Sequence, residues 1–175
     1  MLPDRAFFYA LADAAKAETL PRFRTGGYVT NKLEGGCGPV TEADREAEQA
    51  IRALIRAEHP GHGILGEEFG SENLSSDHVW VIGPVDGTRS FISGIPLWGT
   101  LVGLTERGDA VAGMMAQPFI GELIEAQTAA GTEPGGGPGQ CAGKETSGNK
   151  NVAANIAGVL GLAQNLQPDV FINVT

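Results

Sequence analysis

The stretch VWVIGPVDGTRSF, residues 79–91, decides how the rest of the chain is interpreted. Its first four residues are large and apolar, which is typical of a buried strand. The strand runs into Asp86-Gly87, a dipeptide that favours a turn, and Thr88 follows directly. The stretch therefore predicts a buried strand that delivers an acid, a glycine and a hydroxyl residue to one turn.

Helices are predicted before this strand and further strands after it. Apolar residues at helical spacing predict helices over residues 6–20 and from Thr41 to Pro60. Short apolar runs and turn residues predict strands at 64–65, 79–82, 97–105, 110–117 and 121–126. The fold class expected is a layered α+β fold, with N-terminal helices packed on a mainly antiparallel sheet.

The composition changes after Gln127. Residues 128–150 contain seven glycines and two prolines and almost no large apolar side chain, which is typical of a linker. Residues 151–175 have apolar residues at helical spacing and then a short run that suits a strand. We therefore expect one domain over 1–127, a Gly-rich linker over 128–150 and a short tail over 151–175.

Charge and cysteine content exclude several classes of protein. The 175 residues include 21 acids against 12 lysines and arginines, a net charge of −9, which argues against nucleic acid or an anionic membrane as partner. Cys37 and Cys141 lie far apart without a CxxC motif, so two reduced thiols are expected rather than a zinc site. The sequence has no signal-peptide pattern and no membrane-spanning run, so a cytoplasmic location is expected.

Three acidic groups lie before residue 127, each at the end of a predicted element. Glu42 and Asp44 begin the second helix, Glu67-Glu68 follow a strand, and Asp86 lies in the quoted turn. Mg²⁺ prefers oxygen ligands, chiefly carboxylates and water. Each group also has a structural explanation: a helix start favours acids, adjacent glutamates usually face solvent, and Asp-Gly commonly forms turns.

The residues after Asp86 add features that a metal site alone does not require. Gly87 lets the backbone approach an anion closely, and amides in such a turn can hold phosphate. The hydroxyl of Thr88 could hold or polarise a water molecule. Acids, amides and a hydroxyl together favour metal-assisted phosphoryl hydrolysis. The histidines His59, His62 and His78 are expected at the surface, near predicted turns.

Three motifs occur in a fixed order: PVTEAD at 39–44, LGEE at 65–68 and GPVDGTRSF at 83–91. Together they resemble the inositol monophosphatase superfamily of Mg²⁺-dependent phosphatases. The segments NKLEGG at 31–36 and GIPLWGTLVGL at 94–104 resemble its histidinol-phosphatase branch most closely. The resemblance covers about residues 1–127 and implies the N-terminal half of that family's fold.

The resemblance implies Mg²⁺ as cofactor and a role for each matching residue. Glu67 would ligate metal and, together with Thr88, orient the attacking water. Asp86 and the carbonyl of Val85 would be further ligands, and Asp44 would assist a more weakly bound metal. The substrate implied is a small phosphorylated molecule, and the resemblance allows a homodimer.

At the metal site the chain departs from the family pattern in two places. Gly83 stands where the family normally has a metal-binding aspartate, and glycine has no side-chain oxygen. The later Trp-Asp motif has no counterpart, since no Trp follows Trp98. At the matching positions Gly87 and Thr88, in contrast, the resemblance implies that the backbone amides hold phosphate. We therefore expect a histidinol-phosphatase-like phosphate monoester hydrolase with impaired activity, or alternatively a non-catalytic remnant that binds phosphate, metal or a partner weakly.

Overall fold

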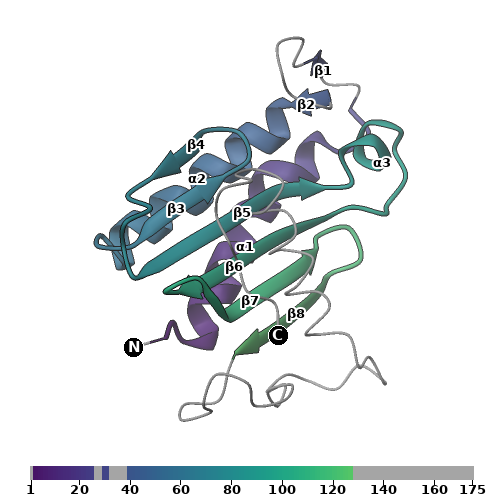
Figure 1. The fold of residues 1–175 in the computed structure, drawn as a ribbon. Coiled ribbons are helices and arrows are strands. Elements are labelled where there is room, and N and C mark those ends of the chain that lie inside the picture. The colour runs from purple at the N-terminus through teal and green to yellow at the C-terminus, as the bar shows by residue number, and fades with distance from the viewer. Residues whose placement is uncertain (1, 26–28, 32–38, 128–175) are drawn as a thin grey trace.

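The computed structural model describes residues 2–25, 29–31 and 39–127 (Figure 1). The predicted linker and tail, residues 128–150 and 151–175, lie outside the described residues. In chain order the elements are α1 (Arg5–Thr19), a 3₁₀ turn (Leu20–Arg22), β1 (Val29–Asn31), β2 (Pro39–Thr41), α2 (Glu42–Glu58), β3 (Gly63–Gly66), β4 (Gly70–Glu72), β5 (His78–Asp86), α3 (Thr88–Ile92), β6 (Gly99–Glu106), β7 (Asp109–Gln117) and β8 (Glu122–Gln127).

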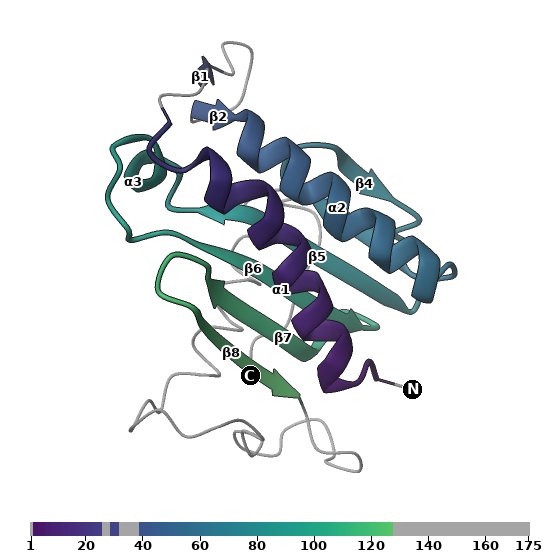
Figure 2. The ribbon, with the colours of Figure 1, turned by 180° about the vertical axis from the view of Figure 1, so that it is seen from behind.

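The main sheet has the strand order β4-β3-β5-β6-β7-β8. Neighbouring strands of this sheet pair antiparallel, except that β3 and β5 are parallel. Strands β1 and β2 form a separate antiparallel pair. Helices α1 and α2 lie side by side and cover one face of this sheet (Figure 2). The predicted layered α+β fold with a mainly antiparallel sheet is confirmed.

Helix α2 begins where the sequence predicts, because its first turn is capped. The backbone N–H of Thr41 donates to the Asp44 carboxylate at 2.8 Å, and the Asp44 N–H donates back to the Thr41 hydroxyl at 3.4 Å. This reciprocal pair satisfies two donors that a helix start would leave without partners. Ile51 and Ile55 lie on the face turned to the sheet and are fully buried.

The middle of strand β5 is apolar because both of its faces are buried there. Trp80 and Ile82 pack into the core beneath the helices, whereas Val81 points to the opposite face. There Val81 is 1% exposed and forms a second cluster with Leu65 and Leu101. Strands buried on both sides carry unbroken rather than alternating apolar runs, which explains the run of residues 79–82.

The short strands β1, β2 and β4 and the short helix α3 were not predicted from the sequence. β4 is three residues of mixed exposure, and its glycine has a left-handed φ of 67°. Strands β6 and β7 form a hairpin that turns through Arg107 and Gly108, both with positive φ. No helix within residues 2–25, 29–31 and 39–127 is long and apolar enough to cross a membrane.

Candidate metal and phosphate site

The site begins with the parallel pair of strands, β3 and β5. Gly66, the last residue of β3, lies opposite Ile82 of β5, and β5 continues past this pair to Asp86, so the two strands end on the same side of the sheet (Figure 1). Glu67 follows β3 directly, and Asp86 is the last residue of β5. The parallel pairing thus places two of the predicted acids beyond the carboxyl ends of neighbouring strands, where ligands commonly bind in open α/β sheets.

The turn after β5 requires a glycine. Gly87 has φ 86° and ψ 35°, a left-handed conformation that side chains other than glycine adopt with strain. A Cβ at this position would lie 2.7 Å from the carbonyl oxygen of Leu97. The Thr88 hydroxyl donates a hydrogen bond of 3.0 Å to the carbonyl of Val85 and closes the turn.

An aromatic cluster holds this turn from beneath. Val85 is 1% exposed and packs with Phe23, Phe91 and Trp98. The three aromatic rings contact each other with centroids 4.9–5.4 Å apart. Asp86, in contrast, is exposed. The turn therefore joins a fixed apolar base to an acid that faces solvent.

Asp44 and Glu42 occupy different environments at the start of α2. Asp44 is 1% exposed, and the Thr41 hydroxyl lies 2.5 Å from its carboxylate. Glu42 is exposed and lies 3.8 Å from Arg22. The helix-start explanation therefore accounts for the contacts between Asp44 and Thr41, and the assistance of Asp44 to a metal stays a prediction.

Gly83 has no unusual backbone. It is a buried residue of β5 that pairs with Leu101, and the glycines with positive φ among the described residues do not include it. The backbone at this position is one that other residues adopt, so conformational need does not explain the glycine. Its absent side chain leaves the start of the turn without a carboxylate.

The oxygen donors at this edge suit Mg²⁺ in kind, although they are few. In the part of the chain that the structure describes, no three His, Cys, Asp or Glu side chains gather as a metal-binding group. Mg²⁺ commonly binds through only one or two carboxylates together with water and substrate phosphate. Glu67, Asp86 and the Val85 carbonyl would be the protein ligands at such a site.

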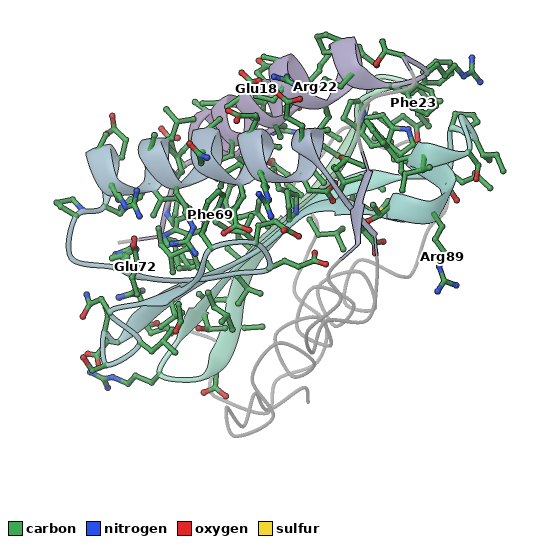
Figure 3. All side chains as sticks on the ribbon, turned by 90° about the horizontal axis from the view of Figure 1, so that it is seen from above. Glu18, Arg22, Phe23, Phe69, Glu72 and Arg89 are labelled. Carbon is green, nitrogen blue, oxygen red and sulfur yellow. The ribbon has the colours of Figure 1, made fainter. Side chains whose placement is uncertain are left out.

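Sequence reasoning missed a buried ion pair behind Glu67. Glu48 and Arg52 are 0% and 3% exposed, and the Glu48 carboxylate lies 2.8 Å from Arg52 Nε. The same carboxylate accepts hydrogen bonds from the backbone N–H groups of Glu68 and Phe69. Figure 3 shows Phe69 beside α2, on the segment that the pair reaches. Four-residue spacing of opposite charges usually indicates a solvated helix face, so this spacing did not predict burial.

The three histidines do not lie freely at the surface as expected. His62 stacks between His59 and His78, with ring centroids 4.7 Å apart on each side. The Trp80 indole N–H donates to His62 Nδ1 at 3.0 Å, and all three histidines are half-buried. Burial, with the neighbouring histidines, lowers the pKa of His62 to about 4. This cluster lies at the amino ends of β3 and β5, opposite the candidate site.

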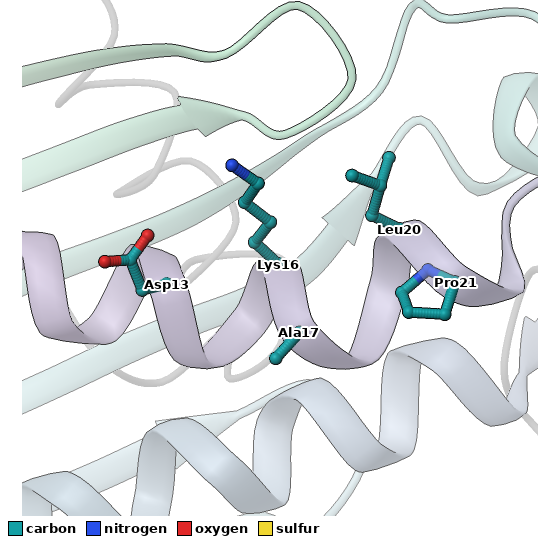
Figure 4. A pocket seen from close by; sticks show the side chains of 5 residues that line it. All are labelled: Asp13, Lys16, Ala17, Leu20 and Pro21. Carbon is teal, nitrogen blue, oxygen red and sulfur yellow. The ribbon is translucent and has the colours of Figure 1, made fainter.

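A surface depression elsewhere contains none of the predicted site residues. It lies along α1 and the following turn and is lined by Asp13, Lys16, Ala17, Leu20 and Pro21 (Figure 4). Arg89, which follows the Gly87-Thr88 turn, is exposed and points away from α3 (Figure 3). The acids and the turn, rather than this depression, define the candidate site.

Comparison with known proteins agrees with this arrangement. The family model described as the inositol monophosphatase family matches residues 3–164. A histidinol-phosphatase of Chlorobaculum parvum is 40% identical over 141 residues, which are 80% of this chain and 54% of that protein. A histidinol-phosphatase of Mycobacterium tuberculosis is 37% identical and covers 63% of this chain and 43% of its own length.

Solved structures show the same fold. The extragenic suppressor protein suhB of Bartonella henselae superposes with a TM-score of 0.64 at 28% identity, covering 70% of this chain and 48% of that one. An inositol monophosphatase of Zymomonas mobilis gives 0.57 at 40% identity, covering 70% and 46%. The chain belongs to the inositol monophosphatase family, and it spans about half the length of the curated relatives it matches.

Proposed function

We propose that this chain carries the metal and phosphate half of a Mg²⁺-dependent phosphate monoester hydrolase. The observation that carries the proposal is that β3 and β5 are parallel neighbours. Glu67 and the Asp86-Gly87-Thr88 turn follow their carboxyl ends, where the chain meets solvent. Carboxylates beside a glycine turn suit a metal and a phosphate group together. The family relationship supports the same chemistry.

Mg²⁺, when bound by Glu67, Asp86 and the Val85 carbonyl, would offset phosphate charge and make bound water more acidic. The Glu67 carboxylate would accept a proton from the attacking water. The Thr88 hydroxyl proton is directed to the Val85 carbonyl, so its oxygen lone pairs would accept a hydrogen bond from the same water and orient it. The roles of these residues follow the family resemblance, and their placement is compatible with them.

Phosphate would be held by backbone amides rather than by the dipole of α3. That helix is only five residues long, too short to build a large dipole. The first N–H groups of a helix have no partner within it. The amides of Gly87 and Thr88, in a turn that only glycine fits well, would therefore donate to the phosphate oxygens.

Histidinol phosphate is the proposed substrate, ahead of inositol phosphate. Two relatives named above are histidinol-phosphatases, and the segments at 31–36 and 94–104 favour the same branch. The substrate carries its own phosphate charge into a protein of net charge −9, which makes a bound cation more important. Impaired turnover is proposed because Gly83 supplies no carboxylate.

A second candidate function is a non-catalytic protein that binds phosphate or metal weakly. The observation that favours it is the small number of acids gathered at the site among the described residues, with none at Gly83. The site residues would then retain binding without turnover.

Phosphate release from histidinol phosphate and from inositol 1-phosphate, with and without Mg²⁺, tests the proposal. Turnover that needs Mg²⁺ and disappears in Asp86→Ala supports the enzyme. Mg²⁺ binding by calorimetry without turnover supports the second candidate. Gly83→Asp should tighten Mg²⁺ binding, since it restores an oxygen ligand on a backbone without strain. Mg²⁺ affinity that survives Asp86→Ala unchanged would contradict the site.

A further inference from the structure

We infer that Glu48, with Arg52, is a positioning residue for Glu67, because the buried pair fixes the backbone of the turn after β3. The inference rests on the proposed function, in which Glu67 holds the metal. Glu48 and Arg52 lie in the middle of α2, whereas Glu67 follows β3. Their side chains contact the turn that carries Glu67.

The Glu48 carboxylate is bound on both of its oxygens. Oε2 accepts from the Glu68 N–H at 2.6 Å, and Oε1 accepts from the Phe69 N–H at 3.2 Å and from Arg52 Nε at 2.8 Å. Arg52 also donates to the carbonyl of Gly70. The pair therefore binds three consecutive residues immediately after Glu67. With their backbone fixed, the direction in which the Glu67 side chain leaves the chain is fixed as well.

Gly66 makes room for this carboxylate on the other side of Glu67. A Cβ on Gly66 would collide with the carboxylate of Glu48 and with Arg52. The glycine of the LGEE motif therefore has a packing reason, because it lets the strand approach these side chains of α2 closely. Glu67 therefore lies between Gly66, which must be small, and the backbone amides that the Glu48 carboxylate binds.

Burial makes this arrangement selective for one conformation of the turn. A carboxylate at 0% exposure is costly unless its hydrogen bonds and its counter-charge are in place. A turn that moved the amides of Glu68 and Phe69 away would leave the charge of Glu48 poorly satisfied. The ion pair thus opposes alternative conformations of the segment that carries Glu67.

The same helix offers a matched control one turn further along. Arg56 hydrogen-bonds to Glu72 at 2.9 and 2.6 Å, but its side chain is 56% exposed. This pair also joins α2 to the β3–β4 segment. Glu72 also lies 3.4 Å from Arg52. The hydrogen bonds of Arg56 go to Glu72 and not to the amides that follow Glu67, so their loss should leave the turn in place.

The test uses the full chain and the variants Glu48→Gln, Arg52→Lys and Arg56→Gln. Gln retains the size of Glu, yet its NH₂ group must face a backbone N–H or the guanidinium. Lys keeps the positive charge and avoids an unpaired carboxylate, so a folded variant is available even where Glu48→Gln unfolds. Amide hydrogen exchange at Glu68 and Phe69, and Mg²⁺ titration below the melting temperature of each variant, are measured.

We expect Glu48→Gln to accelerate exchange of the Glu68 amide and weaken Mg²⁺ binding, each by about tenfold, because a charge-assisted hydrogen bond is lost. Arg52→Lys should give smaller changes in the same direction, and Arg56→Gln should change neither readout. A purely structural role would lower the melting temperature while leaving the Mg²⁺ affinity of the folded protein unchanged.

The outcomes separate this inference from the proposed function. Wild-type protein that binds Mg²⁺, with Glu48→Gln and Arg52→Lys matching its affinity, would overturn the positioning role alone. Exchange at Glu68 that is unaffected by both variants would overturn it too. Absence of Mg²⁺ binding in the wild type would instead overturn the proposed metal site. The proposed effect of Glu48 on metal binding would fall with it.

Discussion

The two ends of strands β3 and β5 are built in opposite ways. At their carboxyl ends a buried ion pair, backbone amides and a left-handed glycine fix the chain through partners of complementary charge or shape. At their amino ends three like side chains, His59, His62 and His78, stack on one another. Both ends belong to the same strands, so the difference lies in the side chains that meet there.

Pairs of complementary side chains and stacks of like side chains respond differently to mutation and to pH. Removing one partner of a buried, complementary pair leaves the other unsatisfied, which is costly at neutral pH. A stack of neutral imidazoles is stable until protonation turns its members into like charges. The site end should therefore be sensitive to mutation, and the histidine end to pH.

The largest effect is expected for Arg52→Met. The substitution leaves the Glu48 carboxylate at 0% exposure without its cation, so the free energy of unfolding should fall by about 3–5 kcal/mol. Arg56→Met removes an exposed pair from the same helix and should cost about 1 kcal/mol or less. Urea unfolding of both variants checks this, and equal losses would mean that burial of the first pair has no consequence.

Gly87→Ala should have the next largest effect, about 2–3 kcal/mol, because it combines a left-handed φ with a clash. The new Cβ would lie 2.7 Å from the Leu97 carbonyl oxygen. Gly70→Ala is the control, since Gly70 has φ 67° and nothing within 4 Å of its Cβ position. Thermal unfolding should show the larger loss at Gly87. If the two losses are the same, backbone strain rather than the Leu97 contact explains the glycine.

The difference between the ends also explains what the sequence could predict. The apolar run of residues 79–82, the Thr41 cap and the Asp86-Gly87 turn depend on neighbours in the chain, and each was predicted correctly. The contacts of Glu48 depend on a turn twenty residues away. The histidine stack joins His59 and His62, which share a turn, to His78 on strand β5. Tertiary packing decided both, and apolar spacing carries no information about either.

Some site assignments stay predictions for a physical reason. Glu67 and Asp86 lie on the same side of the sheet, beyond the carboxyl ends of β3 and β5, because these strands are parallel neighbours. The sequence did not predict this pairing. Their ligand roles depend on an ion that organises the side chains around it. The start of the turn at Gly83 is the position where family pattern and chain differ most.

Thr88→Val should cost about 1–2 kcal/mol, because the carbonyl of Val85, a buried residue, loses its hydrogen bond. Valine keeps the shape of threonine, so the loss reports the hydroxyl. Thr88→Ser keeps the hydroxyl and should retain most of the stability. Chemical denaturation of both variants makes the comparison. Equal destabilisation by Val and Ser would assign the effect to the lost methyl packing or to side-chain shape instead.

The smallest effect is expected at the histidine end, and it appears only as the pH falls. Burial lowers the pKa of His59 and lowers that of His62 to about 4, although His59 caps the carboxyl end of α2, where a cation is usually favoured. The unfolded chain therefore binds more protons than the folded one between the ordinary pKa of about 6.5 and the lowered values, so stability is lost as pH drops through this window. Protonated Nδ1 of His62 could no longer accept from the Trp80 indole.

The variant His62→Gln tests this account, because glutamine can accept the indole hydrogen bond and does not titrate. Between about pH 7 and pH 5 the wild type should lose more stability than the variant, by about 1 kcal/mol or less, since solvent reaches the half-buried rings and screens their charges. Glu72, whose pKa Arg56 lowers through its hydrogen bond, loses its contribution only below its ordinary value, so this range separates the histidines from that carboxylate. Urea unfolding at the two pH values gives the difference. The same loss in both proteins would place the acid sensitivity outside the His62–Trp80 contact, and the contrast between the two ends of the strands would then rest on packing alone.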